Sequence, residues 1–215
     1  MAFHPIDLDT WPRREYYLHY MEAVPCTYSL TVELDITRLR TAPIKLYPAM
    51  LHAITTCVNR HPEFRTALGS DGLPGVFDQM LPCYTVFHPD TETFSNLWTV
   101  YDPDISVFLA NYQQDLALYG QAEGFDGKPD VPGNTFPVSM LPWVSFQSFQ
   151  LHLPLGHRHL LPIFTMGRFF HREDTCLLPL SVQVHHAVCD GFHVSRFLSD
   201  LQEILRQMPL PGSNN

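Results

Sequence analysis

Proline is spread through the whole of this chain, with 19 prolines among 215 residues. Proline lacks a backbone N–H and interrupts both helices and sheet ladders. Together with 11 glycines it divides the chain into short elements. No uninterrupted apolar run of about 18 residues remains, so we expect no membrane span. The core must therefore be built from several short strands and helices.

Hydrophobic spacing predicts which of these elements are helices and which are strands. Helices are expected at about 12–20, 46–60, 103–120 and 197–208. Strands are expected at 26–36, 83–88, 93–101, 143–153, 160–170 and 176–186, with two short extended runs in 64–78. Residues 120–137, rich in glycine and proline, are expected to form a long loop of the functional kind. We expect one α/β (α+β) sandwich domain spanning residues 1–215.

Composition narrows the possible partners and the compartment. Hydrophobic residues make up 45% of the chain, enough for a sizeable core, and the formal net charge is −9. Without a run of Lys and Arg, we expect no nucleic-acid binding. The five cysteines are odd in number and form no CxxC pair, and the N-terminus has no apolar signal segment. These features predict a cytoplasmic protein.

Residues 181–194, SVQVHHAVCDGFHV, place several titratable groups at the end of an apolar strand. Neighbouring side chains of a strand point to opposite faces, so His186 ends the apolar face and His185 ends the polar one. Desolvation favours neutral imidazole, which makes His186 the expected general base. Asp190 would either orient the imidazole or fix the turn through a basic partner. Gly191 permits a sharp turn into the last helix.

The string QVHHAVCDGFH at 183–193 resembles the active-site signature of chloramphenicol acetyltransferases, a family of trimeric, acetyl-CoA-dependent enzymes. Its shorter HHxxxDG core is shared with dihydrolipoyl acyltransferases and peptide-synthetase condensation domains. Other stretches are also similar to the family, in order along the chain: 11–20, 45–50, 85–95, 141–151 and 162–166. The resemblance implies the CoA-dependent acyltransferase fold, a two-layer sandwich of a mixed sheet with helices on one side. It also implies a homotrimer whose active sites are shared between neighbouring subunits.

The resemblance assigns catalytic roles to individual residues. His186 corresponds to the base, whose imidazole the family holds through its own backbone carbonyl. Asp190 corresponds to the partner of Arg13, a structural pair, because a buried carboxylate needs a bidentate cation. Ser139 matches the donor to the tetrahedral oxyanion, and Thr165 matches a hydroxyl that orders a water.

Binding residues follow from the same resemblance. The acceptor pocket is expected to include Tyr20, Phe94 and Leu151. The family has an aromatic acceptor contact in the 120–137 loop, for which Phe125 and Phe136 both qualify. The residues expected near the coenzyme are Trp143, Lys45 and Arg168, the two cations steering its phosphates.

The implied reaction is acetylation of a hydroxyl of chloramphenicol, which inactivates the antibiotic. Acetyl-CoA and acceptor bind together, the transfer is direct, and no metal takes part. Three alternatives stay open: another hydroxyl acceptor, a lipoyl-thiol acceptor, or a non-catalytic CoA-binding scaffold. A chain of this length leaves no room for the lipoyl domain and linker that would accompany the second.

Other interpretations of single residues are weaker. Cys189, beside Asp190, could be a nucleophile, although free cysteine is often a small buried apolar residue. Ser139 could belong to a hydrolase, although no G-x-S-x-G elbow surrounds it. The pair His157 and His159 could bind metal, although their spacing matches no zinc template.

Overall fold

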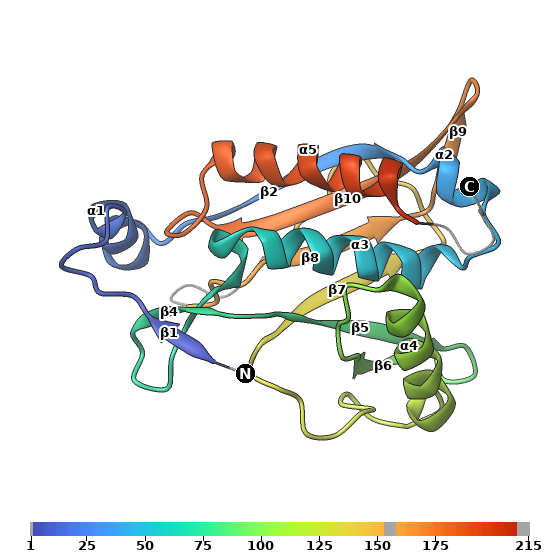
Figure 1. Cartoon of the computed structure of the whole chain (residues 1–215), viewed down its shortest axis with the longest axis horizontal. Helices are drawn as coiled ribbons and strands as arrows, with labels where there is room; N and C mark the ends of the chain where they lie inside the picture. The colour runs from blue at the N-terminus through green and yellow to red at the C-terminus, as the bar shows by residue number, and fades with distance from the viewer. Residues whose placement is uncertain (1, 153–157, 210–215) are drawn as a thin grey trace.

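The computed structural model describes residues 2–152 and 158–209 (Figure 1). Its main sheet has seven strands in the order β2-β10-β8-β7-β5-β6, with β9 paired to β10. β7 runs parallel to β5 and β8, and the other pairs are antiparallel. The strands are β2 (Thr27–Asp35), β5 (Leu81–His88), β6 (Thr93–Trp98), β7 (Thr135–Leu141), β8 (Ile163–Gly167), β9 (Phe170–Arg172) and β10 (Thr175–His185).

A second, antiparallel sheet of three strands holds the N-terminal segment against the rest of the chain. Its order is β1-β4-β3, and its strands are β1 (Phe3–Pro5), β3 (Thr66–Leu68) and β4 (Pro74–Phe77). The ring of Phe3 lies over the glycine of β4, where a Cβ atom at Gly75 would collide with it. The sequence patterns predict no strand at β1, which is too short to have a period.

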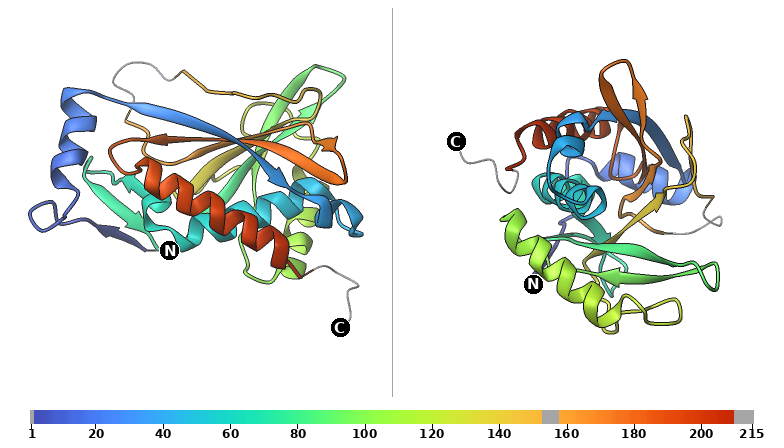
Figure 2. Two further views of the ribbon diagram at one scale, coloured as in Figure 1. Left: turned by 90° about the horizontal axis from the view of Figure 1, so that it is seen from above. Right: turned by 90° about the vertical axis from the view of Figure 1, so that its right-hand side faces the viewer.

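The long helices cover one side of the main sheet. Figure 2 shows α3, α4 and α5 on that side, which confirms the expected two-layer arrangement. No helix in the described ranges combines the length and the apolarity needed to cross a membrane. The helices are α1 (Arg14–Leu18), which continues as a π-helical turn (His19–Ala23), α2 (Thr37–Thr41), α3 (Leu46–Arg60), α4 (Ile105–Tyr119) and α5 (Gly191–Gln207), with a 3₁₀ turn, η2 (Pro62–Arg65), after α3.

Stacked aromatic rings attach α5 to the sheet. The ring of Phe197 on α5 lies 4.3 Å from that of Phe64 and 5.5 Å from that of Phe164 on β8. Phe164 in turn contacts Phe136 on β7, with centroids 5.6 Å apart. All four side chains are fully buried. Burial of each contributes about 1.5–3 kcal/mol to the free energy of unfolding, so the start of α5 has a fixed position.

β10 is buried on both faces. Its even positions pack into the core as expected, and residues 143–152 cover its odd, polar positions. Ser181 Oγ donates to the carbonyl of Phe149 at 2.6 Å. The amide of Gln183 accepts from the backbone N–H of Leu151 at 2.8 Å and donates to its carbonyl at 3.0 Å. The strand predicted here is wrong for residues 143–152, because side chains of β10 take the place of a backbone ladder.

The loop before β7 is shorter than predicted and is held down by a lysine. It ends at Asn134, since β7 begins inside the stretch predicted as loop. Lys128 Nζ lies 2.6 Å from Asp115 Oδ1 on α4, and it donates to the carbonyl of Trp98 on β6 at 2.9 Å. Both charged side chains are largely buried. The lysine therefore fastens the loop to a helix and a strand at once.

Candidate active site

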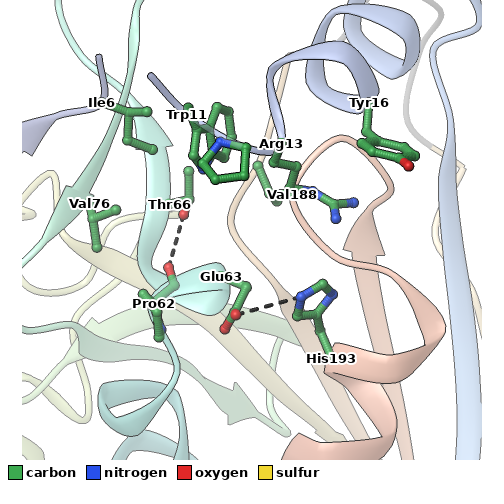
Figure 3. A pocket seen from close by; sticks show the side chains of 11 residues that line it. Ile6, Trp11, Arg13, Tyr16, Pro62, Glu63, Thr66, Val76, Val188 and His193 are labelled. Atoms are coloured by element: carbon green, nitrogen blue, oxygen red, sulfur yellow. Dashed lines mark hydrogen bonds and ion pairs between the residues drawn. The ribbon is translucent and has the colours of Figure 1, made fainter. Parts of the chain in front are cut away.

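A cavity of about 380 Å³ lies beside the end of β10, between the N-terminal segment and α5 (Figure 3). Trp11 and Val188 belong to its apolar wall, and Arg13, Glu63 and His193 supply charged or polar groups. The predicted base, His186, does not line this cavity. Arg13 nevertheless connects the two places, because its guanidinium also reaches the turn that carries His186.

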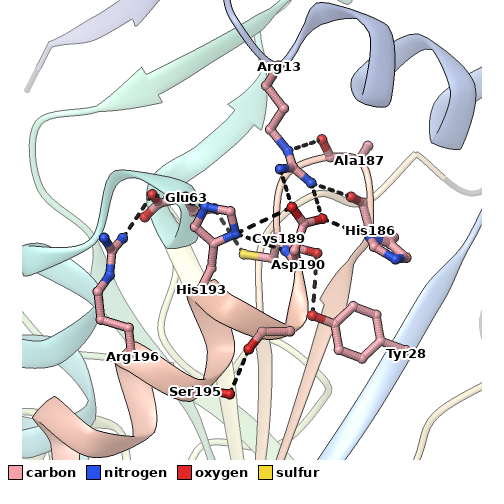
Figure 4. Close-up of polar contacts among 11 residues, drawn as sticks. Arg13, Tyr28, Glu63, His186, Ala187, Cys189, Asp190, His193, Ser195 and Arg196 are labelled. Atoms are coloured by element: carbon pink, nitrogen blue, oxygen red, sulfur yellow. Dashed lines mark hydrogen bonds and ion pairs between the residues drawn. The ribbon is translucent and has the colours of Figure 1, made fainter.

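Arg13 clamps that turn with four hydrogen bonds (Figure 4). Nη1 and Nη2 donate to the two carboxylate oxygens of Asp190 at 2.7 and 2.5 Å. Nε donates to the carbonyl of Ala187 at 2.8 Å, and Nη2 also donates to that of His186 at 2.9 Å. The hydrogen bonds from Arg13 hold the pKa of Asp190 below its usual value. The contact expected between Arg13 and Asp190 is therefore present, in bidentate form.

Aromatic rings fix the His186 imidazole. The Tyr20 ring stacks on it, with centroids 4.0 Å apart and planes 6° apart, and the Tyr28 ring meets it edge-on at 5.3 Å. Its Nδ1 lies 3.1 Å from Asp190 Oδ1, close enough for an ion pair but without the alignment of a hydrogen bond. The carbonyl of His186, expected to hold the ring, accepts from Arg13 instead.

The two adjacent histidines differ as predicted, but their exposure is the reverse of the expectation. The side chain of His186 is 29% exposed in the single chain, whereas His185 is 2% exposed. Burial, with smaller effects from His159 and His186, lowers the pKa of His185 to about 4. His185 Nδ1 accepts from the backbone N–H of Ala187 at 3.2 Å. His185 is therefore a buried, neutral residue at the end of β10.

Ser139 and Thr165 lie side by side on neighbouring parallel strands. They are register partners in β7 and β8, and their hydroxyl oxygens are 3.1 Å apart. Thr165 is also paired across β8 and β10 with Ser181. The three hydroxyls therefore share one face of the sheet, because cross-strand partners point the same way.

Within one chain, Ser139 and His186 are far apart. Ser181 marks the point on β10 that is level with Ser139 and Thr165. His186 comes five residues later, which at about 3.4 Å per residue places it roughly 17 Å further along the strand direction. One copy of the chain does not bring the predicted base to the predicted oxyanion donor.

The residues predicted for the acceptor pocket have very different surroundings. Phe94 is 46% exposed on β6, and Phe125 is 67% exposed with its ring centroid 5.9 Å from that of Phe94. Phe136 is fully buried in the core and has no surface to offer a ligand. The structure therefore favours Phe125 over Phe136 as the aromatic contact. Leu151 is exposed beside Gln183, and Tyr20 covers His186.

Two of the three residues predicted near the coenzyme lie close together. Trp143 is 58% exposed, and its ring meets that of Phe87 edge-on at 4.8 Å. The backbone N–H of Arg168 donates to the carbonyl of Val144, so Arg168 lies next to this tryptophan. Lys45 is exposed immediately before α3. All three side chains are accessible in the single chain.

The structure weakens two of the alternative interpretations. Burial raises the pKa of the Cys189 thiol, whose sulfur faces the carbonyl of Glu63, so this cysteine is not an activated nucleophile. The partner of the Ser139 hydroxyl is Thr165, not a histidine. His157 lies outside the described residues, so the structure does not test the alternative in which His157 and His159 bind a metal.

Tyr28 and Glu63 belong to the surroundings of the site, and sequence analysis did not identify either. The hydroxyl of Tyr28 donates to the carbonyl of Cys189 at 3.4 Å, and burial raises the pKa of this tyrosine. Tyr28 reaches the site because β2 pairs with β10, placing it opposite Val184. Only the strand register could have revealed this contact, and a single sequence does not contain it.

Known proteins resemble this chain in sequence and in fold. A family model for chloramphenicol acetyltransferase matches residues 1–202. A chloramphenicol acetyltransferase of Vibrio anguillarum is 51% identical over 214 residues, covering 100% of this chain and 99% of its own. One from Campylobacter coli is 54% identical over 207 residues, covering 96% and 100%. A solved structure of a chloramphenicol acetyltransferase has the same fold, with a TM-score of 0.80 at 21% identity over 95% of this chain and 100% of that chain. This chain belongs to the chloramphenicol acetyltransferase family.

Proposed function

We propose that this chain transfers the acetyl group of acetyl-CoA directly to a hydroxyl of chloramphenicol, and so inactivates the antibiotic. One observation carries the proposal: the Arg13 clamp on Asp190 fixes the partly exposed ring of His186 in a chain that is 51% identical to a relative named for this activity. The two relatives align with 100% and 96% of this chain, so the proposal draws on the likeness of nearly all of it.

His186 is the general base in this proposal. The Asp190 carboxylate beside Nδ1 favours a proton on that nitrogen, which leaves the lone pair of Nε2 free to accept the hydroxyl proton. Arg13 balances most of the charge of Asp190, so the carboxylate sets the tautomer and is not itself protonated. A fixed imidazole of this kind contributes about 10²–10⁴-fold to a rate.

Ser139 stabilises the oxyanion. As His186 removes the proton, the acceptor oxygen attacks the thioester carbonyl and the Ser139 hydroxyl donates to the negative oxygen that forms, a contact typically worth ~3 kcal/mol. The tetrahedral intermediate then collapses, the carbon–sulfur bond breaks, and protonated His186 returns its proton to the CoA thiolate. Thr165, within hydrogen-bond distance of Ser139, orders a water in the same place. No acyl-enzyme and no metal is needed.

The active unit in this proposal is a homotrimer whose sites are shared between neighbouring copies. The separation of His186 from Ser139 in one chain supports this, because a base and an oxyanion donor must meet at one reacting carbon. A continuous exposed aromatic strip gives further support: Trp143 contacts Phe87, Phe87 pairs across strands with Phe94, and Phe94 contacts Phe125. Such a strip is typical of an interface or a ligand site.

Substrate placement follows from the same arrangement. Phe94 and Phe125 of the aromatic strip receive chloramphenicol together with Tyr20 and Leu151, and Trp143 at the other end of the strip borders the coenzyme. Lys45 and Arg168 attract the coenzyme's phosphates. All five cysteines are free, and Cys57, Cys176 and Cys189 are buried, which supports the expectation of a reducing, cytoplasmic setting.

A thiol-release assay tests the proposal. The purified chain is incubated with acetyl-CoA and chloramphenicol, free CoA is followed with a thiol reagent, and acetylated chloramphenicol is identified by mass spectrometry. We expect CoA and acetylated chloramphenicol in equal amounts. CoA release no faster than the hydrolysis background would overturn the proposal. Release restored by dihydrolipoamide or by another alcohol would then identify one of the other acceptors.

A further inference from the structure

The start of α5 carries a histidine where capping boxes ordinarily have glutamate or glutamine. Asp190 is the N-cap residue of α5, and His193 is the third residue of the helix. The backbone N–H of Asp190 donates to Nδ1 of His193 at 3.0 Å. In a capping box the residue at this position satisfies the N–H of the N-cap residue in this way. A histidine can accept such a bond only with an unprotonated Nδ1, so the neutral ring carries its proton on Nε2.

The Glu63 carboxylate faces the other edge of the His193 ring (Figure 3) and is itself paired with Arg196 (Figure 4). Its Nε2 lies 3.6 Å from Oε1 of Glu63, in the turn η2 after α3. Arg196, one turn further along α5, lies 3.0 Å from the same oxygen. The His193 and Glu63 side chains are 19% and 20% exposed, so solvent screens their contact only weakly. A carboxylate facing Nε2 favours the tautomer that the Asp190 contact requires.

His193 holds Asp190, and Asp190 is the residue that faces the His186 imidazole. Arg13 takes both carboxylate oxygens of Asp190, and Oδ1 of that carboxylate faces the His186 ring. A shift of the Asp190 backbone would therefore move the clamp and the imidazole together. His193 acts from the other side of Asp190, and it lines the cavity of Figure 3 while His186 does not.

We propose that His193 is a positioning residue for the transfer reaction, accepting the backbone N–H of Asp190 so that the His186 imidazole keeps its reactive orientation. This inference rests on the proposed function, and it assigns His193 no contact with either substrate. Its ring is faced by Glu63 and Asp190, which are acidic, and by Arg13 and Arg196, which are basic. Burial is the largest influence and lowers the pKa of His193, which keeps Nδ1 an acceptor.

Two substitutions distinguish a positioning role of His193 from a role in packing alone. His193→Leu removes the acceptor and fills the space with an apolar side chain, whereas His193→Gln restores the usual capping-box acceptor without a titrating group. We expect His193→Leu to lower kcat by about 10–100-fold, since misplacement by about 1 Å can cost 100-fold. The KM values for both substrates should stay within about 3-fold of wild type. His193→Gln should recover most of the lost kcat. Equal losses in the two variants, or a wild-type kcat in His193→Leu, would overturn the proposal.

A spectroscopic measurement tests the contact independently of catalysis. The wild-type protein is labelled with isotopic nitrogen in histidine, and the His193 signals are assigned by their loss in His193→Gln. The proposal predicts the Nε2–H tautomer for His193 at neutral pH, and a changed ring-nitrogen shift for His186 in His193→Leu. An Nδ1–H or protonated His193 would overturn it, even if His193→Leu did not fold. If wild-type protein released no CoA with chloramphenicol but had this tautomer, the proposed acceptor would be wrong and the contact would stand.

Discussion

The ring of Tyr20 lies flat against the ring of His186, with the two planes only 6° apart. Tyr20 belongs to the π-helical turn after α1, while His186 follows β10, so the contact joins two distant segments. Because the rings are stacked, the imidazole cannot turn out of this plane unless the Tyr20 ring moves as well. Arg13, five residues before the end of α1, anchors the same N-terminal segment to the same turn.

Removing the stacked ring should weaken catalysis more than removing its hydroxyl. An aromatic pair is worth about 0.5–1.5 kcal/mol beyond its buried area, so we expect Tyr20→Leu to lower kcat/KM by about 2- to 13-fold. Tyr20→Phe keeps the ring and should stay within about 2-fold of wild type. Steady-state kinetics with acetyl-CoA and chloramphenicol measures both. Equal losses in the two variants would mean that the hydroxyl, not the stack, is the functional part.

Stability should depend on pH through the Arg13–Asp190 pair. Hydrogen bonds from Arg13 lower the pKa of Asp190 in the folded state, so folding favours the charged carboxylate. Its contribution is fully present above the unfolded pKa of about 3.9, and it is lost as pH falls through the lower folded pKa. At neutral pH, Asp190→Asn should lose about 1.5–3 kcal/mol of unfolding free energy. Urea denaturation from pH 7 to pH 3 measures the difference from wild type.

That difference should be constant down to about pH 5 and shrink below it. A difference that grew on acidification would contradict the assigned sign. Arg13→Lys should behave much like Asp190→Asn, because an ammonium group cannot form the two-pronged contact. A fully stable lysine variant would argue against the bidentate pair as the important interaction.

Gln183 should matter for acceptor binding through Leu151. Its side-chain amide makes two hydrogen bonds to the backbone of Leu151 and is 5% exposed. Gln183→Leu should release the exposed segment and raise the KM for chloramphenicol about 5- to 10-fold, equivalent to roughly one lost hydrogen bond. Gln202 offers a matched control, since its amide makes the same two bonds to the backbone of Asp35. Gln202→Leu should leave this KM unchanged, and parallel changes in both variants would remove the local explanation.

Subunit mixing tests whether the site is shared. Chains carrying Ser139→Ala and chains carrying His186→Ala should each be nearly inactive. Unfolding them together and refolding the mixture should restore activity in roughly a quarter of the sites, because random assembly pairs one intact serine with one intact histidine. Mixing the folded proteins without unfolding is the control. No recovery in a mixture that contains mixed trimers would contradict the shared site.

Much of the fold could be predicted because its signals are local. The apolar positions of α3 repeat at helical spacing, and the buried even positions of β10 alternate with polar ones. β7 was not predicted: its first three residues fall in the predicted loop, prolines and glycines precede it, and Pro137 lies within it. The segment at 143–152 alternates like a strand but bonds to side chains of Ser181 and Gln183. Such a substitution for backbone pairing is a tertiary event that no local pattern encodes.

The identity of the main site residues could be predicted from the sequence, but their solvent exposure could not. The family resemblance named His186, Asp190 and Arg13, and the structure brings these three together. The alternation of apolar and polar residues along the strand predicted a buried His186, yet its ring is partly exposed while His185 is buried. Exposure at this point depends on how the N-terminal segment and any neighbouring copy cover the turn. Those are long-range contacts, which periodicity along one strand does not contain.

The most direct test of the account replaces the base itself. His186→Ala should lower kcat for CoA release with chloramphenicol at least about 100-fold, the lower end of what a positioned base contributes. Binding of chloramphenicol and of CoA, measured by calorimetry, should change by no more than about 3-fold. A variant that kept kcat within about 10-fold of wild type would contradict the assignment of His186 as the proton acceptor.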